Sequence, residues 1–143
     1  MKTKIIKAMA ILFLGSASVY AQDTQESQVP SVIVENFKKE FPKASDVEWE
    51  KKGEQYNVDF EIGWGIDYEA WYTTAGKLIK YKQEISDANL PQAIKDAVKK
   101  DHVGFRIDDA TKYVENVVET FKVEIEKGHE ERKILFSKDG KVI

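Results

Sequence analysis

The chain has 143 residues with no cysteine, 22 Lys and Arg residues and 25 Asp and Glu residues, which gives a net charge of −3. The acidic balance argues against nucleic acid or an anionic membrane surface as the partner, since both attract basic proteins. Without cysteine there is neither a disulfide bond nor a lipid-modified cysteine, so stability must come from a buried core.

Residues 1–21 have the features of a secretory signal peptide. A start with three lysines precedes an apolar stretch over residues 8–17, and Ala21 is a small residue before a cleavage site at Gln22. The stretch has about ten residues, whereas a helix that spans a bilayer needs roughly 20, which disfavours an uncleaved membrane anchor. We therefore expect an exported protein, periplasmic or secreted, with no membrane span and a net charge of −6 after removal of the three lysines.

Residues 22–28 are polar and are predicted to form a short disordered leader. The rest of the chain predicts two copies of one unit, residues 29–85 and residues 86–143. Each copy opens with an apolar residue and a proline, Val29-Pro30 and Leu90-Pro91, and proline is well tolerated in the first turn of a helix. Apolar residues at helical spacing follow in both copies: Ile33, Phe37 and Phe41 in the first, and Ile94 and Val98 in the second.

After each predicted helix the apolar period changes from 3.6 to 2, which indicates strands with one buried and one solvated face. Short turns join these strands and require antiparallel neighbours. The sequence thus predicts an α+β fold, a tandem repeat of a helix plus a four-stranded antiparallel sheet. The linker, residues 86–89, leaves open whether the two sheets merge. The predicted strands are 46–51, 56–62, 66–73 and 78–79 in the first copy, and 110–115, 121–125, 131–137 and 142–143 in the second.

Four of these features resemble the PepSY-like proteins of Bacteroidetes: the signal peptide, the helix from Val29-Pro30 to Phe41-Pro42, the strand over residues 56–62 and the turn at Ala75-Gly76-Lys77-Leu78. The resemblance covers about residues 29–143. It implies a periplasmic protein whose tandem units are similar to the fold of beta-lactamase inhibitor protein. It also implies a non-catalytic binding protein and gives no target. The second copy departs from the pattern at His102-Val103, where Phe-Pro is expected, which leaves the end of its helix open.

The sequence contains no recognisable catalytic set. There is no cysteine, no Gly-x-Ser-x-Gly motif and no glycine-rich loop before a helix, and the two histidines are His102 and His129. The sequence His129-Glu130-Glu131 is a poor zinc site, because only His129 and Glu131 share one face of a strand and two ligands do not complete the coordination. We expect no enzymatic activity, no cofactor and no metal.

Four carboxylates share the solvated face of the two strands that the turn Gly63-Trp64-Gly65 joins: Asp59, Glu61, Asp67 and Glu69. Like charges in facing positions destabilise a sheet, so an opposite charge should lie nearby. Lys80 and Lys82 on the next strand are the preferred source, and a divalent cation or a basic partner are the alternatives. A periplasmic sensor of a small ligand or cation, using this acidic face, is therefore the alternative function.

The first copy also has an excess of aromatic residues. Because alternate residues of a strand share a face, Tyr68 and Tyr72 are assigned to the core and Trp71 to the face of the carboxylates. Trp64 lies at a hairpin tip. One interpretation is that Trp64 folds back over the second copy, or that Trp71 packs under the helix of the other unit; the other is that these side chains are anchors for a partner. The sequence favours a binding module that recognises a protein or peptide through its sheet face and hairpin tips. Its candidate contact residues are Trp64, Trp71, Asp67, Glu69 and Trp49.

Overall fold

The computed structural model describes residues 22–143, so the predicted signal peptide lies outside the described residues. In this part of the chain, neither helix has the length and apolar character needed to cross a membrane. The elements are β1 (Gln22–Thr24), η1 (Glu26–Gln28), α1 (Ser31–Glu40), β2 (Ala44–Lys52), β3 (Gln55–Ile62), β4 (Ile66–Thr73), β5 (Leu78–Glu84), η2 (Asp87–Asn89), α2 (Gln92–Asp101), β6 (Arg106–Glu115), β7 (Val118–Lys127) and β8 (Glu130–Ser137).

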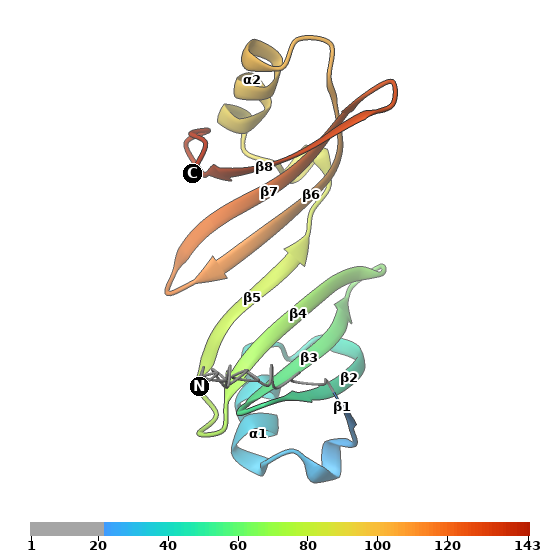
Figure 1. Ribbon diagram of the computed structural model, residues 1–143. Helices are drawn as coiled ribbons and strands as arrows, with labels where there is room; N and C mark the ends of the chain where they lie inside the picture. Colours follow the sequence, from blue (N-terminus) through green and yellow to red (C-terminus); the bar gives the residue numbers. More distant parts are fainter. Residues whose placement is uncertain (1–21) are drawn as a thin grey trace, which may run out of the picture.

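The eight strands form one continuous antiparallel sheet in chain order, from β1 to β8 (Figure 1). The two copies merge because β5 pairs with β6, from Lys80 opposite Glu115 to Glu84 opposite Thr111. The linker therefore lets the sheet of the first copy continue directly into that of the second.

The two copies differ at their last strand. In residues 29–85, α1 is followed by four strands, β2 to β5, whereas α2 is followed by three, β6 to β8. The predicted strand at residues 142–143 is only an isolated bridge between Val142 and Phe136.

Residues 22–28, expected to be a disordered leader, instead form β1 and η1. Gln22 lies opposite Lys51 in the β1–β2 ladder, and Lys38 of α1 donates a hydrogen bond to Glu26, with 2.7 Å between Nζ and Oε1. The exposed edge of β2 offers unpaired backbone groups to any neighbouring segment. The polarity of the side chains in this segment does not reveal that backbone pairing.

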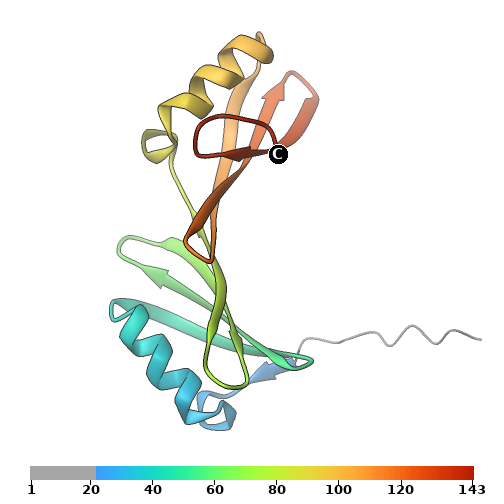
Figure 2. The same ribbon diagram turned by 90° about the vertical axis from the view of Figure 1, so that its left-hand side faces the viewer.

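Each helix covers its own half of the sheet and closes a separate core. Ile33 and Phe37 of α1 are buried with Phe60, whereas Ile94 and Val98 of α2 are buried in a second cluster. Both helices lie on one side of the sheet and leave the other face uncovered (Figure 2). The side chains on that uncovered face are available for contacts.

The two helices begin and end with nearly the same backbone geometry. The φ and ψ angles are −51° and 132° at Pro30, and −52° and 135° at Pro91. At the other end they are −124° and 65° at Phe41, and −129° and 60° at His102. The departure from Phe-Pro in the second copy thus does not change how its helix ends.

Candidate functional site

The uncovered face of the sheet is built from alternate residues of its strands, because successive side chains of a strand point to opposite faces. The register of the ladders places one row of these residues across both copies, in the order Glu48, Asp59, Glu69, Lys82 and Tyr113. The face opposite the helices therefore runs without a break from the first copy into the second.

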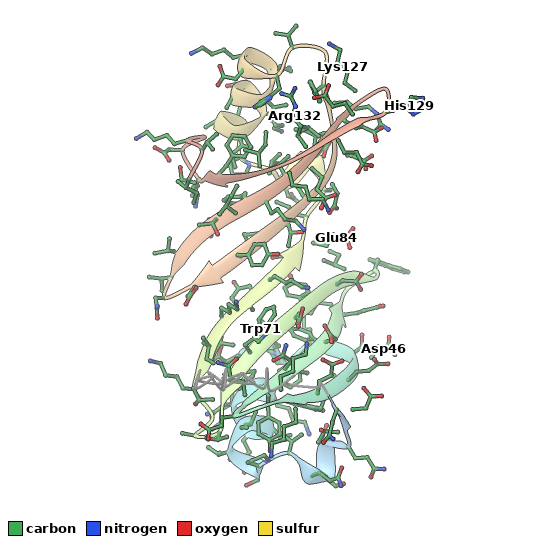
Figure 3. The ribbon with its side chains drawn as sticks, in the orientation of Figure 1. Asp46, Trp71, Glu84, Lys127, His129 and Arg132 are labelled. Atoms are coloured by element: carbon green, nitrogen blue, oxygen red, sulfur yellow. The ribbon has the colours of Figure 1, made fainter. Side chains whose placement is uncertain are left out.

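A groove of about 650 Å³ lies on this face and is lined mainly by carboxylates. Those of the first copy are Asp46, Glu48, Asp59, Glu61, Asp67 and Glu84. Asp109 of β6 adds a seventh, and the positively charged residues of the lining are Lys82 and Lys122. We call this feature the acidic groove; Figure 3 labels Asp46 and Glu84 in it.

The register places the four predicted carboxylates of β3 and β4 in facing positions. Asp59 lies opposite Glu69, and Glu61 lies opposite Asp67. Two like-charged pairs on neighbouring strands weaken the sheet by a few tenths of a kcal/mol to about 1 kcal/mol each. The structure neutralises only one of the four side chains.

That side chain is Glu69, which is buried. Its Oε2 lies 2.5 Å from Nζ of Lys82, Nζ of Lys52 lies 3.8 Å from its Oε1, and Asn57 donates a hydrogen bond of 2.9 Å. Burial acts to lower the pKa of Lys82, but the hydrogen bond and the charge of Glu69 outweigh it and leave that pKa above its ordinary value. Of the two lysines named from the sequence, Lys82 thus neutralises a carboxylate, whereas Lys80 lies over the ring of Trp71.

The other three carboxylates, Asp59, Glu61 and Asp67, have no ion-pair partner among the described residues. Burial raises the pKa of Asp59, and the nearby charges of Glu69 and Glu50 raise it further. The acidic groove therefore carries negative charge that the fold itself does not neutralise.

These carboxylates do not form a metal cage. Across the described part of the chain, no group of three or more His, Asp or Glu side chains is placed to hold a metal ion. The possible cation site at Asp59, Glu61, Asp67 and Glu69 therefore loses its support, since Glu69 already binds two lysines. A broad charged groove remains in place of a small coordination site.

Trp64 stands wholly in solvent, with a relative accessibility of 102%. It lies between Gly63 and Gly65, whose φ angles of +72° and +69° belong to a left-handed region that favours glycine. The loop therefore holds the indole away from both copies, and the alternative in which Trp64 folds back is wrong. Glu61 and Asp67, which flank the tip, line the acidic groove.

Three other candidate contact residues are less available. Trp49 is buried and packs edge-on against Phe37, with 5.3 Å between the ring centroids, so its assignment as a contact residue is wrong. Trp71, labelled in Figure 3, is half-buried and lies 4.9 Å from Nζ of Lys80 and 5.8 Å from Nζ of Lys82. Glu69 is only 8% exposed. Of the candidate contact residues, Trp64 and Asp67 are exposed.

Sequence reasoning missed the carboxylates that line the groove outside β3 and β4. Asp46 and Glu48 of β2 alternate within one predicted strand, a signal that was present in the sequence. Glu84 and Asp109 join the groove only because β5 pairs with β6. No local pattern specifies that pairing.

The sequence matches the family model described as "Putative beta-lactamase-inhibitor-like, PepSY-like" twice, over residues 18–80 and 54–143. No curated protein matches it. Among solved structures, the chain is similar to a BLIP-like protein from Bacteroides fragilis NCTC 9343, with 24% identity and a TM-score of 0.68 over 80% of this chain and 82% of that one. A DUF2874 family protein from Bacteroides uniformis ATCC 8492 has 21% identity and a TM-score of 0.70, covering 80% and 86% of the two chains. A putative periplasmic protein from Bacteroides eggerthii DSM 20697 has 19% identity and a TM-score of 0.69, with the same coverage.

Proposed function

Because the chain belongs to the putative beta-lactamase-inhibitor-like, PepSY-like family, as its sequence motifs predict, we propose that it is an exported, non-catalytic binding module. It recognises a protein or peptide through the uncovered sheet face and the β3–β4 hairpin tip. Export is supported by the signal-peptide features of residues 1–21 and by the description of a structural neighbour as periplasmic. Each copy has its own buried hydrophobic core.

The exposure of Trp64 is the observation that carries this proposal. A tryptophan buries roughly 150–250 Å² on contact, which corresponds to about 4–6 kcal/mol of hydrophobic free energy. The folded chain gains none of it, because both flanking glycines hold the indole in solvent. A partner surface that covers Trp64 gains most of it, as at the tryptophan hot spots of known interfaces.

The surroundings of Trp64 also suit an interface. Glu61 and Asp67 flank the tip on the uncovered face, and Ile66, which points to the side of the helices, is 40% exposed. The tip is thus an apolar contact surrounded by charged groups, which is the common arrangement of a protein–protein interface. By contrast, neither His102 nor His129 lines the acidic groove, so the groove holds no histidine base.

The test is capture of a partner from a periplasmic extract of the native host by the immobilised protein. We expect Trp64→Ala to lose a captured protein that the wild type retains, because the anchor is gone. Its free energy of unfolding should stay within about 0.5 kcal/mol of the wild type, since Trp64 contacts no core residue.

The matched control is Val103→Ala, which removes an apolar side chain that is 74% exposed at the far end of the second copy. The control should capture the same protein as the wild type. If Trp64→Ala and the wild type retain identical sets of proteins, Trp64 is not an anchor and the proposal is wrong.

A further inference from the structure

Resting on the proposed function, we infer that the acidic groove receives an extended segment of the partner that is rich in lysine or arginine. This segment crosses strands β2 to β6, and an adjoining apolar part of the partner covers Trp64 at the rim. The chemistry of recognition is thus a row of cationic side chains beside one hydrophobic anchor.

The unpaired charge of the groove is the first support. Seven carboxylates line it against two lysines, and Lys82 is already bound to Glu69. Ammonium and guanidinium groups supply donors and positive charge together.

The second copy shows that the scaffold does not require this imbalance. In the first copy, Val58 of β3 faces Ala70 of β4; Asp59 follows Val58, and Glu69 precedes Ala70. The corresponding positions of β7 and β8 hold Glu124 and Lys133. Those two side chains form an ion pair of 3.1 Å, and Lys122 lies 3.2 Å from the same carboxylate.

The next acidic position behaves in the same way. Glu126 of β7 corresponds to Glu61 and pairs with Arg106, whereas Glu61 forms no ion pair within residues 22–143. Glu131, which faces Glu126 as Asp67 faces Glu61, forms no ion pair in this part of the chain, and neither does Asp67. At the two positions compared, the second copy thus pairs its negative charge, whereas the first copy leaves Asp59 and Glu61 without an ion pair among the described residues. This difference marks the first copy as the side that meets a cationic partner.

The dimensions of the groove fit an extended segment. Neighbouring strands lie about 4.8 Å apart, so the path across the five strands from β2 to β6 is about 19 Å long. An extended chain rises about 3.3 Å per residue, so about six residues span this path, with alternate side chains facing the groove. Basic residues at every second position would stand about 6.6 Å apart, so three of them would be distributed over the five strands.

The hairpin tip favours a peptide over a small polyamine. Trp64 offers an exposed apolar side chain three residues along the hairpin from both Glu61 and Asp67. A polyamine would occupy the charged groove and leave the exposed indole uncovered. A protein segment can cover both, which makes the affinity depend on the tip and on the carboxylates together.

The experiment measures the binding of a fluorescein-labelled peptide of four Lys-Ala repeats ended by a tryptophan, with four Glu-Ala repeats as the probe of opposite charge. Glu61→Gln with Asp67→Asn should weaken binding of the lysine peptide at least tenfold. The matched control, Glu35→Gln with Glu40→Gln on the exposed side of α1, removes the same charge outside the groove and should change binding less than twofold. Binding should also weaken strongly between 50 and 200 mM salt.

A purely structural role of the carboxylates is excluded by a second readout. Removing the facing charges of Glu61 and Asp67 relieves repulsion, so the Tm of the groove variant should equal or exceed that of the wild type while binding is lost. A lower Tm together with weaker binding would overturn the inference, because the loss would then follow from damage to the fold.

Three further outcomes overturn the inference: no binding of the lysine peptide, equal binding by the groove variant and the α1 control, or displacement by spermine with no effect of Trp64→Ala. If one of them occurs while Trp64→Ala still loses its captured protein, the proposed function stands and only the cationic segment is wrong. If Trp64→Ala captures normally as well, the proposed function fails independently.

Discussion

The two copies share one backbone arrangement but differ in their cores and on the uncovered face of the sheet. The core of the first copy is aromatic, with Phe37 at 5.0 Å from Phe60 and 6.5 Å from Tyr72 between ring centroids. The core of the second copy is mainly aliphatic and centres on Ile94 and Val98. Different side chains therefore fill the same arrangement of helix and strands, which shows that pattern and volume, rather than residue identity, specify this fold.

Charge differs between the copies as much as packing. Residues 22–85 contain thirteen acidic and eight basic residues, whereas residues 86–143 contain twelve and eleven. The second copy has nearly equal numbers of opposite charges and pairs Glu124 with Lys133 and Glu126 with Arg106 across its strands. The first copy leaves charge open beside an exposed tryptophan. The duplicated scaffold thus provides structural support in one copy and a candidate recognition surface in the other.

The cores give the largest expected difference between the copies. Phe37→Ala should lower the free energy of unfolding by about 4 kcal/mol, since it removes a ring at the centre of the aromatic cluster. Val98→Ala, at the corresponding position of α2, should cost about 2 kcal/mol because it removes less volume. Urea unfolding measures both, and equal losses would contradict the difference between the two cores.

The turns that close the copies give the next effect. Gly76 and Gly140 have φ angles of +85° and +83°, so alanine is strained at both positions. A Cβ at Gly140 would stand 2.5 Å from the carbonyl oxygen of Ala93, whereas at Gly76 the nearest atoms, at 3.0 Å, belong to the side chains of Asn36 and Val32.

Because side chains can move and backbone cannot, Gly140→Ala should cost about 3 kcal/mol and Gly76→Ala about 1–2 kcal/mol. Thermal unfolding monitored by circular dichroism distinguishes the two variants. A larger loss for Gly76→Ala would show that the second turn adapts more easily than its packing indicates.

The ion pairs of the free face provide a third comparison. Glu69→Ala leaves Lys82, Lys52 and Asn57 without their shared acceptor and should cost about 2 kcal/mol. Lys133→Ala in the second copy removes an exposed pair and should change stability little. Chemical denaturation of both variants checks this, and similar losses would show that burial of Glu69 is unimportant.

The smallest effect concerns the dependence of stability on pH. The folded chain raises the pKa of Asp59 above its ordinary value of 3.8, so ionisation of Asp59 lowers stability as the pH rises through the raised pKa. Asp59→Asn should therefore stabilise the protein at pH 7 by about 0.5 kcal/mol, and this gain should disappear below pH 3.8, where Asp59 is protonated in both states.

Glu124 in the second copy should behave in the opposite way. Its hydrogen bonds with Lys133 and then Lys122 lower its pKa below 4.5, so its contribution to stability is present above 4.5 and is lost as the pH falls through the lowered pKa. Glu124→Gln should thus slightly destabilise the protein at pH 7. Thermal unfolding of both variants at pH 7 and pH 3.5 measures the two signs, and a shared sign would contradict the comparison.

The periodicity of apolar residues was sufficient to predict both helices and the strands at the centre of each copy. The strand over residues 66–73 has the predicted bounds, and Phe60 and Tyr72 are buried as parity requires. Parity also applies to Trp49, which lies between Glu48 and Glu50 and therefore on the opposite, buried face. Its aromatic character alone had suggested a contact residue.

Long-range pairing was harder to predict. The acidic groove depends on the register between β5 and β6, and the order of residues 22–28 depends on the open edge of β2. Both are contacts between backbone groups that carry no local signature in side-chain type. Sequence periodicity thus predicts which face a residue occupies within its strand, but not which distant strand will be its neighbour.

The position of Trp64 also gives the protein an internal optical probe. An indole in water emits at longer wavelength than one in an apolar interior, so the emission of Trp64 should lie to the red of that of Trp49. When a partner covers the hairpin tip, the emission of Trp64 should shift to the blue while that of the buried Trp49 stays fixed, and a Trp71→Phe background removes the third tryptophan from the spectrum. Association could therefore be followed on the unlabelled protein.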